Sequence, residues 1–120
     1  MSVRVFVYGT LQPGQSRWPT LAQYVDPRKP PIRAGTPGAL YDTHCGWPAA
    51  VFSQRTARLV PGSVVAIEAG REGAALADMD EIEGVDHGLF VRTEVLAHGS
   101  VCWAYHWPGG TDGFALINAW

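Results

Sequence analysis

Positive charge is scarce in this sequence, and no segment concentrates it. Lys and Arg number 9 against 11 Asp and Glu, which gives a formal net charge of −2 at pH 7. The densest basic stretch is the pair Arg28-Lys29. Because nucleic-acid binding depends on clustered cations, we expect no nucleic-acid partner. Long apolar runs are also missing, so we expect neither a membrane partner nor a signal peptide before the first strand.

Cysteine is equally scarce, which limits redox and metal chemistry. Cys45 and Cys102 are the two cysteines. They could pair, but two cysteines without a secretion signal are more typical of a reduced, cytoplasmic protein. His44 adjoins Cys45, yet a nucleophilic Cys–His pair requires a base aimed at the sulfur, which chain neighbours rarely achieve. The four histidines show no metal-ligand spacing, so we expect no metal and no cofactor.

Glycine and proline are abundant, with 14 and 9 residues in a chain of 120. This length suits one domain, residues 1–120, and the many chain-breaking residues favour short strands over a helical bundle. Ser16 is a candidate cap for a first short helix, and Gly84 follows a second helix as a C-terminal glycine should. We expect turns at 46–48 and 60–62, a loop at 26–31, helices over 16–24 and 72–83, and strands over 3–7, 32–41, 49–52, 63–67, 89–96 and 101–107, with a tail that packs back.

The loop after the first expected strand begins with Tyr8-Gly9-Thr10-Leu11. Glycine lets the backbone turn sharply and lets a ligand approach main-chain N–H groups without a side chain in the way. Such a loop can hold a small anion such as a carboxylate, although an ordinary β-turn has the same appearance. It is neither a Walker loop, since no Gly-Lys-Ser/Thr follows, nor a dinucleotide fingerprint.

A carboxylate occupies the apolar face of the second expected helix. Glu83 follows Leu76 by seven residues and Met79 by four, so it projects from the same face, whereas Asp78 and Glu81 project elsewhere as solvated acids. Burial and the negative end of the helix dipole should both raise the pKa of Glu83. A carboxyl group near neutrality can accept and return a proton. The alternative is a frayed helix end with Glu83 turned to water.

These segments together resemble the gamma-glutamylcyclotransferase family, whose fold AIG2-like proteins share. The resemblance covers nearly the whole chain and rests on residues 8–11, 38–41, 47–51, 61–64, 79–84, 89–92 and 117–120. It implies a small α+β domain with a mixed, strongly curved β-sheet or barrel, one main helix and a pocket at its mouth.

The resemblance also implies a reaction, the cyclisation of a gamma-glutamyl group to 5-oxoproline with release of an amine or amino acid. Glu83 would act as general base and then general acid. The residues implied for substrate binding are Tyr8, Gly9, Thr10, Leu11 and Tyr105. Phe90 departs from the family, in which many members carry tyrosine, and Asn118-Ala119 stands where Gly-Asp is common.

Alternatives to this interpretation remain at the level of the sequence. Tyr105 alternates with Val101, Trp103 and Trp107, as plain strand packing requires. The chain could also be a non-catalytic binding or regulatory module, or, more remotely, an acyl-transfer enzyme that uses Cys45. The sequence leaves the gamma-glutamyl compound and the oligomeric state open. The cyclotransferase interpretation requires Glu83 to lie across the pocket from the N–H groups of the loop.

Overall fold

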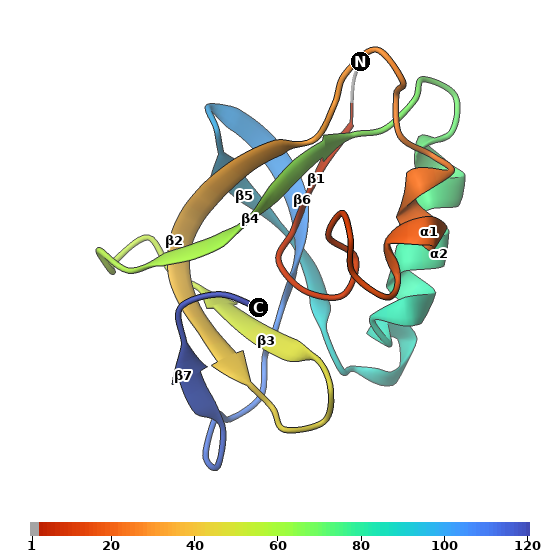
Figure 1. The fold of residues 1–120 in the computed structure, drawn as a ribbon. Coiled ribbons are helices and arrows are strands. Elements are labelled where there is room, and N and C mark those ends of the chain that lie inside the picture. Colours follow the sequence, from red (N-terminus) through yellow and green to blue (C-terminus); the bar gives the residue numbers. More distant parts are fainter. Residues whose placement is uncertain (1–2) are drawn as a thin grey trace.

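A curved β-sheet with helices on one side forms the protein in this computed structural model, which describes residues 3–120 (Figure 1). The described residues form seven strands, two α-helices and one 3-10 turn. In chain order these are β1 (Arg4–Val7), α1 (Trp18–Ala22), β2 (Ile32–Asp42), β3 (Pro48–Phe52), β4 (Leu59–Ala66), α2 (Glu72–Ile82), η1 (Val85–His87), β5 (Val91–Ala97), β6 (Ser100–His106) and β7 (Ala115–Ile117). None of the helices in this part of the chain is long and apolar enough to cross a membrane.

The sheet is mixed and nearly closed. Its strand order is β3-β2-β4-β1-β6-β5, with β7 paired to β2. The pair β1–β6 is parallel, and every other pair is antiparallel. The two ends of this order approach each other, because the Trp107 N–H donates to the Ala50 carbonyl at 2.8 Å and the Thr36 hydroxyl donates to the Leu96 carbonyl at 2.8 Å. The expected α+β class with a strongly curved mixed sheet and one main helix is confirmed.

Strand β2 produces much of the curvature by changing partners along its length. Residues 32–37 pair with β4, whereas residues 38–42 pair with β3. Gly38 stands at the change, where an added Cβ would lie 2.6 Å from the Val51 carbonyl oxygen. The glycine therefore lets two backbones approach closely at the bend.

Two hydrophobic regions lie on opposite faces of the sheet. The barrel interior holds residues such as Phe6, Leu40 and Val60, whereas Val5 and Met79 belong to the layer between the sheet and the helices. Alternation along β1 sends Val5 and Phe6 to opposite faces, as the period of two requires. Both helices cover the same face of the sheet (Figure 1).

Two local expectations are wrong. The segment 60–62 is not a turn but part of β4, in register with residues 34–36 of β2. Gly62 is needed because the Val7 carbonyl oxygen of β1 would lie 2.3 Å from an added Cβ, so the glycine marks a close strand contact rather than a reversal. Ser16 does not cap α1, because the helix begins at Trp18 after Arg17 and has no side-chain cap.

Candidate active site

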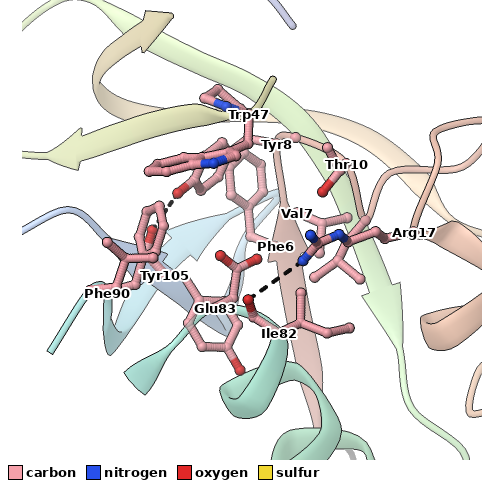
Figure 2. A pocket seen from close by; sticks show the side chains of 14 residues that line it. Phe6, Val7, Tyr8, Thr10, Arg17, Trp47, Ile82, Glu83, Phe90 and Tyr105 are labelled. Carbon is pink, nitrogen blue, oxygen red and sulfur yellow. Dashed lines mark hydrogen bonds between the residues drawn. The ribbon is translucent and has the colours of Figure 1, made fainter. Parts of the chain in front are cut away.

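A cavity of about 180 Å³ opens where the β1–α1 loop meets the end of α2 and the segment before β5 (Figure 2). Its volume is below the 300–1,000 Å³ typical of drug-sized ligands, so it suits a group of amino-acid size. The lining consists of Phe6, Val7, Tyr8, Gly9, Thr10, Leu11, Arg17, Trp47, Pro48, Ile82, Glu83, Leu89, Phe90 and Tyr105. All six site residues expected from the sequence are therefore brought to one cavity.

The loop after β1 lines this cavity, and three of its backbone donors have no partner among the described residues. Its turns are fixed by hydrogen bonds from the Gln12 N–H to the Gly9 carbonyl (3.1 Å) and from the Arg17 N–H to the Thr10 carbonyl (2.8 Å). Within residues 3–120, no acceptor pairs with the N–H groups of Gly9, Thr10 or Leu11. Unpaired N–H groups beside a cavity are suited to bind an anionic oxygen.

Gly9 also has a packing reason for being glycine. An added Cβ would lie 2.7 Å from Cγ and 2.9 Å from Cδ of Pro48, the residue that begins β3. Because a proline ring is rigid, it cannot move aside as the end of a long side chain would. Contact between Gly9 and Pro48 therefore joins two walls of the cavity.

Tyr8 is buried and its hydroxyl is held in place. The Tyr8 hydroxyl donates to the Tyr105 carbonyl oxygen at 2.6 Å (Figure 2). Burial raises the pKa of Tyr8 well above 10, and the nearby charge of Glu83 raises it further. The phenol is thus neutral at physiological pH and serves as a fixed polar group beside the carboxyl.

The end of α2 carries Glu83 into the cavity. Glu83 caps the helix directly after Ile82, and its N–H donates to the Met79 carbonyl at 2.9 Å. Gly84 then adopts φ +64°, and the Leu89 N–H bonds back to the Gly84 carbonyl at 3.0 Å. An added Cβ on Gly84 would lie 3.1 Å from the Leu89 Cβ, so the chain needs glycine to turn here. Figure 2 shows the Glu83 carboxyl directed into the cavity rather than outward.

The surroundings of Glu83 bring the pKa of its carboxyl group close to neutral pH. Burial raises the pKa of Glu83 from 4.5 to about 7, and the Arg17 guanidinium partly opposes this rise. The sequence-based expectation that burial raises the pKa of Glu83 agrees with this result. Such a group is present in both protonation states near pH 7, which general acid–base catalysis requires.

Arg17 is the charged lining residue that the sequence did not reveal. Its guanidinium donates to the Ile82 carbonyl at 3.5 Å, so it lies over the last turn of α2, where a cation is favourable. The side chain is solvent-exposed and follows an irregular loop, which gives no periodic signal. Its one sequence signal is its place between the Tyr8–Ser16 loop and the start of a helix.

Two tyrosines bond to acidic residues of α2. The Tyr105 hydroxyl donates to Asp80 at 2.7 Å, and Asp80 also faces Arg92 at 3.4 Å. The Tyr105 ring lines the cavity, but its hydroxyl is engaged with this carboxylate. Asp78 accepts a hydrogen bond from the Tyr24 hydroxyl, so the expectation that Asp78 is merely solvated is wrong. These bonds fasten the helix that bears the carboxyl.

Phe90 lines the cavity, whereas neither cysteine does, which argues against the acyl-transfer alternative that uses Cys45. Phe90 is 3% exposed, lines the cavity and packs edge-on against Trp47 with ring centroids 5.7 Å apart. Cys45 is exposed and Cys102 buried, both with free thiols, and neither belongs to the cavity lining. The described lining contributes one carboxylate and no histidine or cysteine, which is a sparse donor set for a metal.

Comparisons with known proteins agree with this architecture. A family model described as gamma-glutamyl cyclotransferase, AIG2-like, matches residues 5–118. An AIG2-like protein from Mus musculus is 16% identical with a TM-score of 0.75, the match covering 99% of this chain and 88% of that one. An uncharacterized protein from Pyrococcus horikoshii is 20% identical with a TM-score of 0.72, covering 97% and 86%.

A third solved structure, YkqA from Bacillus subtilis, is larger than this chain. It is 21% identical with a TM-score of 0.71, and the match covers all of this chain but 40% of that protein. At these identities the structures show a shared fold. No curated protein sequence matches the chain.

Proposed function

Because the chain belongs to the AIG2-like gamma-glutamyl cyclotransferase family, we propose that it converts a gamma-glutamyl amine or amino acid into 5-oxoproline and a free amine. Glu83 is the general base and then the general acid. Tyr8, Gly9, Thr10 and Leu11 bind the substrate, together with the ring of Tyr105. The reaction requires no cofactor, and we place it in the cytoplasm.

One observation carries this proposal. Glu83, whose pKa burial raises to about 7, lines the same cavity as Gly9, Thr10 and Leu11, whose backbone N–H groups have no partner among the described residues. A proton acceptor and an oxyanion-binding loop are the two elements that aminolysis of an amide needs.

The reaction is intramolecular, so the protein has to fold the substrate and move protons. The Glu83 carboxylate accepts a proton from the alpha-ammonium group, and the freed amine attacks the gamma-carbonyl carbon. A C–N bond forms and the carbonyl oxygen becomes negative, where the N–H groups of the Gly9–Leu11 segment stabilise it. Glu83 then returns the proton to the leaving nitrogen as the original amide C–N bond breaks. The nitrogen that attacked gives its second proton to the Glu83 carboxylate, from which it passes to the released amine, so that Glu83 ends the cycle ionised.

Arg17 and Tyr8 have supporting roles in this proposal. The Arg17 guanidinium attracts the alpha-carboxylate of the substrate and favours the ionised form of Glu83. The Tyr8 hydroxyl, already donated to the Tyr105 carbonyl, keeps the wall of the cavity rigid rather than exchanging a proton.

The test measures 5-oxoproline and free amine released from a set of gamma-glutamyl amines and amino acids. We expect release by the wild type and a loss of at least about a hundredfold in Glu83→Gln, the low end of general-base contributions. Glu81→Gln is the matched control, since Glu81 is exposed two residues earlier. Full activity of Glu83→Gln would refute the mechanism. A wild type that binds these compounds without turnover would instead support the binding-module alternative.

A further inference from the structure

The cavity has two chemically different ends, with Glu83 between them. Figure 2 shows Arg17 and Thr10 on one side of the Glu83 carboxyl and Phe90 and Trp47 on the other. The first end offers backbone N–H groups and a guanidinium, whereas the second offers aromatic rings. A gamma-glutamyl substrate whose alpha-carboxylate occupies the first end must direct its amine substituent toward the second.

The second end is a fixed aromatic wall made of Trp47, Phe90 and Trp107. The ring centroids are 5.7 Å apart for Trp47–Phe90, 5.4 Å for Phe90–Trp107 and 5.8 Å for Trp47–Trp107. Each ring thus contacts both others, in the edge-on or tilted geometries that aromatic pairs favour. Trp47 and Phe90 line the cavity directly, and Trp107, which is not among the lining residues, packs against both rings.

The loop that presents Trp47 is also held in place. The buried Thr43 hydroxyl donates to the Trp47 carbonyl at 2.6 Å, and the Cys45 N–H donates to the Thr43 oxygen at 3.2 Å. These bonds fix the turn before β3. A rigid ring in a rigid loop discriminates between substituents better than a mobile one.

Charge distinguishes the two ends further. Among the described lining residues, Glu83 and Arg17 alone carry charge, and Arg17 is on the side of the loop. A leaving amino acid brings a carboxylate, which would find no cation at the aromatic wall. An uncharged apolar substituent would instead bury its surface against the rings.

Given the proposed function, we propose that the aromatic wall selects gamma-glutamyl amides whose leaving amine carries a flat apolar group, and that Trp47 determines this preference. The test compares gamma-glutamyl benzylamide, gamma-glutamyl methylamide and gamma-glutamylglycine. Benzylamide and methylamide both release an alkylamine, so the chemical step is similar and the wall makes the difference.

We expect kcat/KM for the benzylamide to exceed that for the methylamide by about tenfold or more, as burial of one apolar group against a pocket wall allows. We expect gamma-glutamylglycine to be the poorest of the three. In Trp47→Ala the benzylamide-to-methylamide ratio should fall toward one, whereas Trp47→Phe should retain most of it. Trp120→Ala, which removes a tryptophan outside the cavity lining, should leave the ratio unchanged.

Failure of this inference is separable from failure of the proposed function. Equal kcat/KM for the two amides in the wild type, or a ratio unchanged in Trp47→Ala, would refute the role of the wall while leaving cyclisation intact. If no substrate is turned over, calorimetric binding of the two amides decides instead. Tighter binding of the benzylamide that Trp47→Ala abolishes would support the aromatic wall, and equal affinities would refute it.

Discussion

Replacing Glu83 with glutamine should stabilise the protein at pH values above neutrality while abolishing turnover. Burial raises the pKa of Glu83 from 4.5 to about 7, so the folded protein holds this proton more tightly than the unfolded chain does. Below the unfolded value both states are protonated and the carboxyl imposes no penalty. As the pH rises from the unfolded value to the folded value, the unfolded chain ionises more readily than the folded protein, so stability is lost over this interval and is constant above it.

The magnitude follows from those two pKa values. A rise from 4.5 to about 7 corresponds to about 3 kcal/mol of folding free energy, at about 1.4 kcal/mol for each pH unit. This is a large share of the ~5–15 kcal/mol by which domains are usually stable. Glutamine has nearly the same shape and no charge, so it avoids the penalty.

Urea unfolding of both proteins over a pH series measures this effect directly. The stability of Glu83→Gln minus that of the wild type should rise by up to about 3 kcal/mol between ~pH 4 and ~pH 8 and then level off. Glu81→Gln, at an exposed position of the same helix, should show a flat difference. A flat difference for Glu83→Gln as well would refute the claim that Glu83 is ionised with difficulty.

Three further predictions concern the same cavity. For the wild type, log kcat/KM should fall below the Glu83 pKa of about 7, so that kcat/KM at pH ~6 is roughly a tenth of that at pH ~8. A profile without an acid limb would contradict this. In Arg17→Gln the acid limb should move to higher pH, because the guanidinium that lowers the pKa of Glu83 is gone, whereas Arg17→Lys should leave the limb nearly in place. Gly9→Ala should lower the free energy of unfolding by about 1–3 kcal/mol, because the new Cβ would lie 2.7 Å from Pro48. Gly110→Ala, with nothing within 4 Å, should be nearly silent in the same denaturation assay.

Periodicity predicted the position of Glu83 because a helix repeats regularly. Once Leu76 and Met79 mark the apolar face, the phase of the helix assigns Glu83 to it, and the structure ends α2 at that residue. The hairpin between β5 and β6 was equally predictable, because His98-Gly99 separates two strand-like segments by two residues. In the structure these two residues form the turn, with φ values of +50° and +72°. Both features depend on residues close together in the chain.

Features that depend on distant partners were not predictable in the same way. Pro61-Gly62 is typical of a turn, but Gly62 is required by the backbone of β1, which no local pattern reveals. Arg17 was missed for a related reason. Its role comes from the Ile82 carbonyl, 65 residues away in the chain.

The combination of burial and one exposed cation would suit this carboxyl to the two proton transfers that we propose for it. A base of low pKa would accept a proton from an ammonium group poorly, whereas an acid of high pKa would seldom be ionised at the start. Burial moves the pKa of Glu83 upward and Arg17 opposes that rise, leaving it at about 7. Because Arg17 lies at the surface, its opposing effect is adjustable by a single substitution without opening the core. The opposing part of this tuning therefore rests on a surface residue that follows the loop beginning at Tyr8, whereas the upward part rests on the burial of Glu83 itself.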